Sequence, residues 1–366
     1  MKAAKSSPAH LYVHVPFCRH ICYYCDFVHG IYREQSADAW LDALEKEIAL
    51  RTLPKHLDTI YIGGGTPTSL SPAQLHRLLS LLDGKSPYEY TVEADPGTID
   101  AEKAAMLVDH GVNRVSIGMQ SADDGLLKAI GRHHTHADTI EAVSLLQKTG
   151  IDNLSLDLLY SLPGQTMEML KDSVQAACAL SPKHISVYSL TIEENTVFGK
   201  KGMHALDEDT EADMYEYLRD TLPAYGYHRY ETANFAKKGY ESRHNLCYWN
   251  YRDFLGFSCG ASGKEGNVRY DKTRSLSEYL KDPLAAETIE LTPEDAMFEC
   301  IMMNLRKKEG LLLSDFEEMF HVSVFAAFGE KLQALLKEGS LCTDGKRLYC
   351  SEHGYDILNS ILTELL

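Results

Sequence analysis

Strand-like runs alternate with helical runs through residues 11–235, and this alternation constrains the fold more than any other feature. Each apolar run is followed by a segment whose apolar residues recur at helical spacing. Such β-then-α units build a parallel sheet, and right-handed crossovers curl it into a full or partial barrel. The expected strands are Leu11–Val15, Asp58–Ile62, Tyr90–Glu93, Arg114–Gly118, Leu154–Leu159 and His184–Leu190, and the helices between them are Ala39–Leu50, Pro72–Leu82, Ala101–His110, Ala137–Thr149 and Met167–Leu180.

The alternating pattern stops near residue 235, which divides the chain into parts. Further helical runs follow Thr292, which is placed to cap a helix, and a short hairpin is expected around Asp344-Gly345. Helices followed by such a hairpin resemble a winged-helix-like module. The α/β chain is therefore predicted to have an N-terminal tail (1–10), a partial six-unit barrel (11–235), a connecting segment (236–290) and a smaller, mostly helical C-terminal domain (291–366).

Composition and charge limit the classes of function. The 366 residues are 44% hydrophobic and 24% charged, and their net charge is −17. Nucleic acid is not expected as the main partner, because binding phosphates needs clustered Lys and Arg. No apolar run is long enough to span a bilayer, and residues 1–10 lack the apolar core of a signal peptide. Only three of the nine cysteines cluster, which is typical of a reducing compartment, so a cytoplasmic location is expected.

Three cysteines stand close together directly after the first expected strand. Cys18, Cys22 and Cys25 have C-x3-C-x2-C spacing, which places three soft ligands in one tight loop. A structural zinc site uses four ligands and an iron–sulfur cubane normally uses four cysteines, so this loop alone leaves one metal position unfilled. In a [4Fe–4S] cluster, the fourth iron would be free for a small chelating molecule. The alternatives are a zinc site completed by His20 or His29, and three buried core cysteines.

Other candidate ligand-binding residues lie at or near the ends of expected strands, where the site of a parallel barrel is built. The run Gly63-Gly64-Gly65-Thr66-Pro67 lets the backbone approach a ligand, although a tight turn has the same composition. Glu93 and Gln120 end later strands and Arg132 opens a loop; for Glu93 and Gln120 the alternative is capping of neighbouring loops. Asp157 stands in an apolar strand, so we expect it to face the barrel mouth or to be hydrogen-bonded there.

Two stretches carry other expectations. The aromatic- and glycine-rich stretch from Tyr248 to Gly263 is expected to fold back over the mouth of the barrel. The histidine group of His133, His134 and His136 is expected to form a solvated loop rather than a set of ligands.

The cysteine spacing and the glycine run resemble the radical S-adenosylmethionine (SAM) superfamily. The resemblance implies an open barrel of six units and a [4Fe–4S] cluster whose free iron is chelated by SAM. From Tyr12 through Pro163 and beyond, the chain is similar to the HemN/HemW group of oxygen-independent coproporphyrinogen III oxidases and haem chaperones. Matching motifs imply cluster ligands at Cys18, Cys22 and Cys25 and SAM contacts at Tyr12, Tyr24, Gly64, Gly65, Thr66 and Glu93. Gln120, Arg132 and Asp157 match positions that contact a second SAM in the oxidases; here the alternatives are a second SAM, a single SAM or haem.

Three features resemble the HemW branch more than the oxidase branch. The oxidases carry another cysteine two residues after the third, and here that position is Phe27. Only ten residues precede Leu11, whereas the oxidases have a longer arm. Finally, the segment His244–Trp249 fits the His-Asn-x-x-Tyr-Trp motif that HemW proteins use for haem.

The residue types of this segment also suit haem on chemical grounds. Imidazole, as in His244, is a good ligand for haem iron, and the rings of Tyr248 and Trp249 offer flat apolar faces to a porphyrin. Asn245 could orient the ring or meet a propionate, and Arg243 could pair with a propionate. The alternative is a helix or loop packed into an interdomain seam.

These observations favour a HemW-type haem chaperone, which binds haem, a [4Fe–4S] cluster and exchangeable SAM, and transfers haem to an acceptor protein. The alternatives are an oxygen-independent coproporphyrinogen III oxidase, which decarboxylates propionate side chains, and a radical SAM enzyme with another substrate, in which His244–Trp249 is structural. The expected partners are a haem acceptor and an electron donor. Two further associations are left open: a homodimer, and peripheral contact with a membrane through the acceptor.

Overall fold

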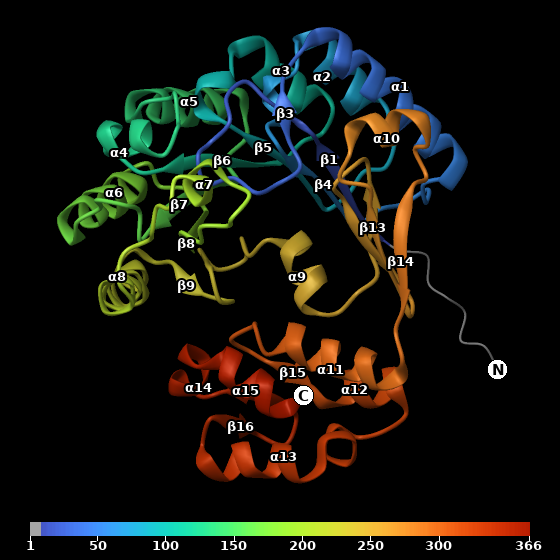
Figure 1. Ribbon diagram of the computed structural model, residues 1–366, viewed down its shortest axis with the longest axis vertical. Coiled ribbons are helices and arrows are strands. Elements are labelled where there is room, and N and C mark those ends of the chain that lie inside the picture. The colour runs from blue at the N-terminus through green and yellow to red at the C-terminus, as the bar shows by residue number, and fades with distance from the viewer. Residues whose placement is uncertain (1–8) are drawn as a thin grey trace.

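The computed structural model describes residues 9–366, so residues 1–8 of the expected tail lie outside the described part. Its centre is a nine-stranded sheet in the order β11-β1-β4-β5-β6-β7-β8-β10-β9, which curls into a partial barrel (Figure 1). The six strands from β1 to β8 in this order run parallel. They are β1 His10–Val15, β4 Thr59–Gly64, β5 Glu89–Ala94, β6 Arg114–Gln120, β7 Leu154–Tyr160 and β8 His184–Ser189. The six predicted strands are therefore confirmed.

Helices cover the outer face of this sheet (Figure 1). They are α1 Glu34–Arg51, α2 Pro72–Ser80, α3 Ala101–Asp109, α4 Asp124–Ala129, α5 His136–Thr149, α6 Met167–Ala179 and α8 Glu208–Thr221. The short helix α7 (Val197–Lys200) lies instead beside the loop that carries the cysteines, where the Phe198 backbone N–H donates to the Tyr23 carbonyl at 2.8 Å. Local sequence sets their ends: Ser71 forms a capping box with Gln74 at the start of α2, and Gly150 ends α5 with a φ of +102°. Apolar side chains such as Trp40 and Leu44 of α1 are fully buried in the layer between helices and sheet, and this burial stabilises the barrel.

The edges of the sheet differ from the expectation. β11 (Leu255–Phe257) pairs with β1, with Leu255 opposite Leu11, and adds a further parallel strand. At the other edge, β10 (Asn234–Ala236) and β9 (His228–Arg229) add antiparallel strands beside β8. The prediction that Tyr248–Gly263 folds over the barrel mouth is therefore wrong. This stretch supplies an edge strand instead, because β1 would otherwise expose unpaired backbone groups.

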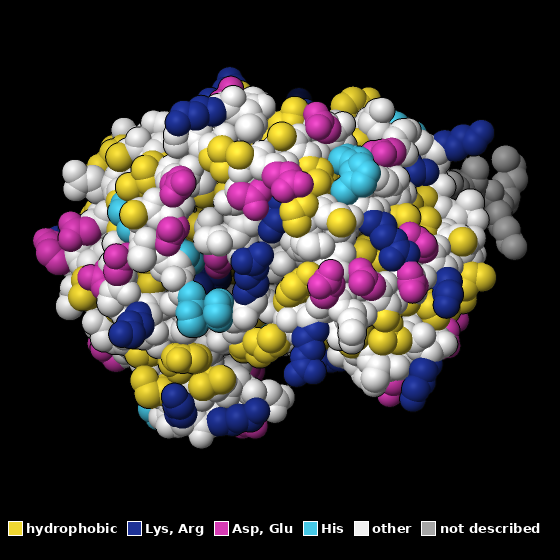
Figure 2. All heavy atoms as spheres, turned by 90° about the horizontal axis from the view of Figure 1, so that it is seen from above, with side chains coloured by type: hydrophobic (Ala, Val, Ile, Leu, Met, Phe, Trp, Pro, Cys, Tyr) yellow, Lys and Arg dark blue, Asp and Glu magenta, His cyan; other side chains and the backbone are white. Residues whose placement is uncertain are grey.

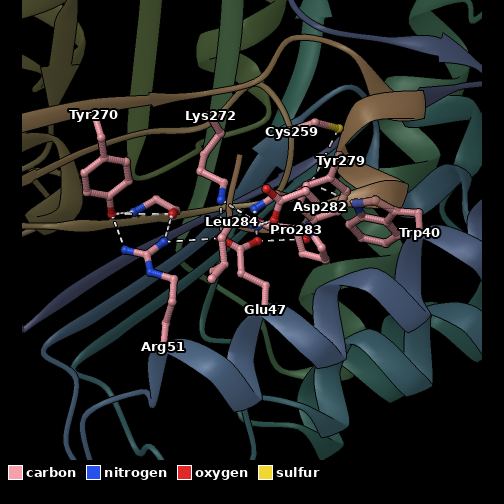
Figure 3. A network of polar contacts seen from close by, with 12 residues as sticks. Trp40, Glu47, Arg51, Cys259, Tyr270, Lys272, Tyr279, Asp282, Pro283 and Leu284 are labelled. Atoms are coloured by element: carbon pink, nitrogen blue, oxygen red, sulfur yellow. Dashed lines mark hydrogen bonds and ion pairs between the residues drawn. The ribbon is translucent and has the colours of Figure 1, made fainter. Parts of the chain in front are cut away.

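The connecting segment packs against α1 through a small antiparallel sheet. That sheet consists of β12 Ser262–Glu265, β13 Val268–Lys272 and β14 Ala286–Glu290, with α10 Leu276–Lys281 between the last two. Glu47 of α1 is fully buried at this contact (Figure 3). Its carboxylate lies 2.9 Å from Lys272 Nζ and accepts hydrogen bonds from the Tyr279 hydroxyl at 2.8 Å and from the Ser258 backbone at 2.9 Å. Because a buried charge is tolerated only when it is paired, this network holds the segment on α1.

Residues of the C-terminal part surround a second hydrophobic core below the barrel (Figure 1). Its elements are α11 Pro293–Asn304, β15 Leu311–Leu312, α12 Leu313–Phe320, α13 Val324–Glu338, β16 Leu341–Thr343, β17 Arg347–Cys350, α14 Glu352–Asp356 and α15 Leu358–Leu365. The mostly helical character, the hairpin and the cap at Thr292 are confirmed. The chain after this hairpin forms two helices rather than one, because the backbone of Ile357 (φ −108°, ψ 25°) leaves the helical region between α14 and α15.

The surface of the molecule carries both signs of charge. On the face seen in Figure 2, acidic and basic side chains are interspersed and no broad basic patch gathers. Within residues 9–366, no helix combines the length and the apolar character that crossing a membrane requires.

Candidate functional site at the mouth of the barrel

A cavity of about 750 Å³ opens inside the barrel. It extends from the cysteine loop, at the carboxyl ends of the strands, to Asn245 of α9 (Arg243–Trp249). Its volume lies within the range of a site for one small ligand. The fold brings together at this cavity the predicted residues Cys18, Cys22, Tyr24, Cys25, Gly64, Gly65, Thr66, Glu93, Gln120, Arg132 and Asp157.

The cysteine loop is closed at its base and tied to the barrel. β2 (Phe17–Cys18) pairs with β3 (Gly30–Ile31), and the Tyr23 backbone N–H donates to the Ile130 carbonyl at 3.0 Å. All three thiols of the loop are free and partly exposed. Burial raises the pKa of Cys18 to about 11 and that of Cys25 to about 12. Both side chains therefore stay protonated until a metal displaces the proton.

The three thiols fit a cluster better than a single ion. Among residues 9–366, no three His, Cys, Asp or Glu side chains converge as ligands of one ion. His29, a candidate fourth zinc ligand, has its Nδ1 3.7 Å from Cys25 Sγ and 2.5 Å from the Phe27 carbonyl, so that nitrogen is already engaged. Three free thiols around one end of a cavity are instead a ligand set for three irons of a cubane. The adjoining space would admit a chelating molecule at the fourth iron.

The glycine run after β4 packs too closely against the cysteine loop to carry side chains. A Cβ on Gly65 would lie 2.6 Å from the Phe17 carbonyl oxygen, which real structures do not tolerate. Gly64 has a φ of +102°, a conformation that glycine adopts without strain. The run then leads to Thr66, whose hydroxyl donates to Cys18 Sγ at 3.6 Å. It is therefore a cradle beside the cysteine loop.

Glu93, in β5, faces the cavity and holds the glycine cradle in place. Its Oε2 accepts a hydrogen bond from the Gly64 backbone at 3.0 Å, and its Oε1 accepts one from the Tyr61 hydroxyl at 2.7 Å. Burial raises the pKa of Glu93 to about 7. Near neutral pH the carboxyl therefore exists in both protonation states, and it can bond an amine or a hydroxyl of a ligand.

Arg132 joins the cysteine loop to the end of β5. Its Nη1 lies 2.8 Å from Asp95 Oδ2, and its Nη2 donates to the Tyr24 hydroxyl at 3.0 Å. Although burial alone would raise the pKa of Asp95, His134 and Arg132 lower it to about 2. The prediction of a solvated histidine loop is wrong for His134, which is buried with its Nδ1 3.4 Å from Asp95. His133 remains exposed.

Gln120 and Asp157 line the cavity from neighbouring strands. The pairing of β6 with β7 shifts register just before Gln120, whose φ is +61°. Such a bulge redirects a side chain at the end of a strand. Both carboxylate oxygens of Asp157 lie 3.2 Å from the Ser116 hydroxyl, and burial raises the pKa of Asp157. The lone carboxylate of this strand is hydrogen-bonded inside the cavity, as its sequence context predicts.

The helix α9, which lies below the sheet in Figure 1, contacts the amino ends of β4 and β5. Glu89, the first residue of β5, accepts hydrogen bonds from the backbone N–H groups of Arg243 and His244, each at 2.9 Å. The His244 side chain is buried: its Nδ1 lies 2.7 Å from the Thr59 hydroxyl and its Nε2 2.8 Å from the Tyr248 hydroxyl. This predicted haem ligand therefore has both ring nitrogens engaged.

Tyr12 and the aromatic residues of α9 do not line the cavity. The Tyr12 hydroxyl lies 3.0 Å from His14 Nδ1, beneath the cradle. The indole Nε1 of Trp249 is buried without a hydrogen-bond partner in the described chain.

Sequence reasoning missed several residues of the cavity wall. Arg114, Ser186 and Tyr188 line it, and so does Asn245, which the sequence had suggested only as a contact of haem. Arg114 and Ser186 stand near the amino ends of β6 and β8, where a parallel barrel is not expected to build its site. The signal that could have found Arg114 is a cation inside an apolar strand, because such a charge needs a partner.

Comparison with known proteins agrees with this site. Residues 12–177 match the radical SAM superfamily and residues 291–357 match the HemN C-terminal domain. The solved structure of coproporphyrinogen III oxidase (HemN) from Escherichia coli has the same fold, with a TM-score of 0.85 at 24% identity over 98% of this chain and 90% of that one. The fold and the site thus define a radical SAM protein, and that superfamily implies a [4Fe–4S] cluster and SAM.

Curated relatives show to which family of radical SAM proteins the chain belongs. Over 98% of this chain it is 40% identical to the heme chaperone HemW of Lactococcus lactis, covering 97% of that protein. It is 37% identical to the heme chaperone HemW of Bacillus subtilis and 34% identical to that of Escherichia coli, with 98% of each protein covered. The chain belongs to the HemW family.

Proposed function

We propose that this protein is a haem chaperone, which binds haem and transfers it to an acceptor protein. The observation that carries the proposal is the sequence identity of 40% and 37%, over nearly the whole chain, to two proteins named heme chaperone HemW. Phe27 supports it, because the oxidases resembled by this chain have a cysteine at the matching position. An electron donor would be a further partner.

The residues at the mouth of the barrel fit the two cofactors. Cys18, Cys22 and Cys25 would hold the cluster, and Gly64 to Thr66 with Glu93 would hold SAM. When bound, the cluster supplies single electrons to SAM. The chain positions these cofactors and excludes water from them. Arg132 holds Tyr24 beside the thiols, and the glycine run lets SAM approach the backbone closely.

For the cargo we propose a site at α9, with His244 as the iron ligand. In this structure, the Tyr248 hydroxyl is hydrogen-bonded to Nε2 of His244 and the Thr59 hydroxyl is hydrogen-bonded to Nδ1. Iron therefore replaces one of these hydrogen bonds. The Tyr248 bond is the one to open, because both residues lie on α9 and a change in side-chain rotamers separates them, whereas Thr59 belongs to the sheet.

The decisive experiment is a haem titration of the anaerobically reconstituted, full-length protein. We expect about one haem per chain, and a sharp loss of affinity in His244→Ala. The matched control is His184→Ala: His184 is also fully buried at the start of a barrel strand, with Nδ1 2.8 Å from the Ser155 hydroxyl and Nε2 2.8 Å from the Tyr230 hydroxyl. Equal affinities of the two variants would remove His244 from the site, and absence of haem binding would remove the function.

The oxidase alternative has its own test. Conversion of coproporphyrinogen III to protoporphyrinogen under reducing conditions with SAM would replace the chaperone proposal by an oxidase. We expect no conversion.

A further inference from the structure

Arg114, the first residue of β6, places a guanidinium at the inner end of the barrel cavity with no group to hold it. The residue is only 2% exposed and lines the cavity. Within residues 9–366, its Nε has no hydrogen-bond partner, and no carboxylate lies within ion-pair distance of its guanidinium. Burial disfavours the charge, but the more distant carboxylates Glu89 and Asp157 outweigh this and raise the pKa of Arg114, so the guanidinium is charged. A buried cation that lines a cavity and lacks hydrogen bonds can bind an anion from outside the chain.

The carboxylates that act on Arg114 through space, Glu89 and Asp157, are already engaged. The two oxygens of Glu89 accept hydrogen bonds from the first backbone N–H groups of α9 at 2.9 Å. The two oxygens of Asp157 lie 3.2 Å from the Ser116 hydroxyl. Neither carboxylate is hydrogen-bonded to Arg114 in residues 9–366, so the donors of Arg114 are open to a ligand.

Asn245 of α9 brings a side-chain amide to the same cavity. Thr91, the register partner of Arg114 on β5, is fully buried but does not line the cavity, so it is not counted as part of the site. Guanidinium and amide donors together suit an oxyanion.

The charge and shape of the cavity favour a carboxylate among the oxyanions. A guanidinium binds a planar carboxylate through two parallel hydrogen bonds. A phosphate would bring up to two negative charges into a cavity that already contains Glu93 and Asp157. We propose that Arg114, with Asn245, forms a binding site for the carboxylate of a small organic ligand.

Two kinds of ligand could bring such a carboxylate, carried on a flexible methylene chain, to Arg114. One is a propionate arm of haem, and this source rests on the proposed function. The other is a free short-chain acid, which does not. The two experiments below distinguish these two kinds of ligand.

The haem arm compares haem with haem dimethyl ester on the full-length protein. If a propionate binds Arg114, the ester binds about tenfold to a hundredfold more weakly, the range for one charge-assisted pair. Arg114→Gln lowers the affinity for haem to that for the ester. The matched control is Arg252→Gln, which removes a 56% exposed cation outside the cavity lining and leaves the difference between haem and ester intact.

The free-acid arm compares propionate with propionamide, which has the same shape and no charge. Propionate raises the thermal unfolding midpoint of the wild-type protein, propionamide does not, and Arg114→Gln abolishes the difference. A protein that binds no haem but responds to propionate retains this site and loses the proposed function.

Several results overturn the site: no difference within either pair of probes on the wild-type protein, or a difference that Arg114→Gln leaves unchanged. Where Arg114→Gln does not fold, Arg114→Lys keeps the charge and removes the two-pronged geometry. Where neither variant folds, the test is the rate at which phenylglyoxal modifies Arg114 in the wild-type protein, measured by peptide mass spectrometry. Slower modification with propionate or haem, but not with their neutral analogues, supports the site, and an unchanged rate overturns it.

Discussion

The Nε2 atom of His244 lies 2.8 Å from the hydroxyl of Tyr248, one turn further along α9. On the other side of the ring, Nδ1 lies 2.7 Å from the Thr59 hydroxyl. Burial lowers the pKa of His244 to about 3, so the imidazole is neutral at physiological pH. Neutral imidazole is the form that binds haem iron. The Tyr248 hydroxyl therefore competes with iron for the nitrogen that the proposed function requires.

Replacing Tyr248 by phenylalanine tests this competition. Tyr248→Phe removes one hydrogen bond from His244 and keeps the aromatic ring, so we expect haem affinity to rise about fivefold, the worth of one net hydrogen bond. Haem titration by absorbance measures the change. Tyr251→Phe serves as the control, because the Tyr251 hydroxyl donates to Glu299 at 3.0 Å and not to His244. A loss of affinity in Tyr248→Phe as large as that of His244→Ala would show that the hydroxyl itself holds haem.

Cys22→Ser tests the cluster. Removing one of three thiolates leaves two irons without protein ligands, so we expect loss of most iron and sulfide and of the brown absorbance after anaerobic reconstitution. Cys178→Ser is the control, because Cys178 is buried in α6 away from the cavity. Full iron and sulfide in Cys22→Ser, determined chemically, would refute the ligand assignment.

The barrel, and the residues that line the carboxyl end of its cavity, could be predicted from the sequence. Strand-like runs separated by helical runs fix which residues stand at carboxyl ends of strands, and the fold gathers Cys18, Glu93 and Gln120 there. Their roles as ligands of a cluster or of SAM stay predictions, since capping of neighbouring loops was an equal alternative for Glu93 and Gln120. Local signals such as the Ser71 cap also carried over.

Features that depend on contacts distant in the chain could not be predicted. β11 completes the sheet only because it meets β1, and nothing local in Leu255–Phe257 specifies that partner. His134 has the flanking residues of a surface loop, yet Asp95 and its own burial place it inside. The engagement of His244 likewise depends on Thr59, which the sequence does not relate to α9.

The raised pKa of Glu93 predicts a pH dependence of stability. Below its ordinary pKa of 4.5, the carboxyl is protonated in both the folded and the unfolded chain. Between this value and about 7, the unfolded chain ionises while the folded chain keeps the proton, so stability falls as pH rises, by about 3 kcal/mol. Glu93→Gln removes this fall. Urea unfolding of both proteins without SAM at pH 5 and pH 7.5 measures it.

The control for Glu93 is an exposed glutamate. Glu168→Gln should keep the pH dependence of the wild-type protein, because the Glu168 side chain is 73% exposed. Identical pH dependences of Glu93→Gln and the wild-type protein would contradict the raised pKa.

The buried network around Glu47 predicts that this carboxylate stabilises the attachment of the connecting segment to α1 (Figure 3). Glu47→Gln leaves the ammonium of Lys272, only 2% exposed, without its anion, since Glu47 is its ion-pair partner at 2.9 Å. Removing one member of a buried pair typically costs about 3 to 5 kcal/mol, and we expect a loss of unfolding free energy in that range. Urea unfolding measures it, and Glu168→Gln, which breaks an exposed pair with Lys171, should change stability by less than about 1 kcal/mol. Equal losses in the two variants would show that the network does not hold the segment. The double variant Glu47→Gln, Lys272→Met should recover part of the loss, because it removes the uncompensated charge as well as its partner.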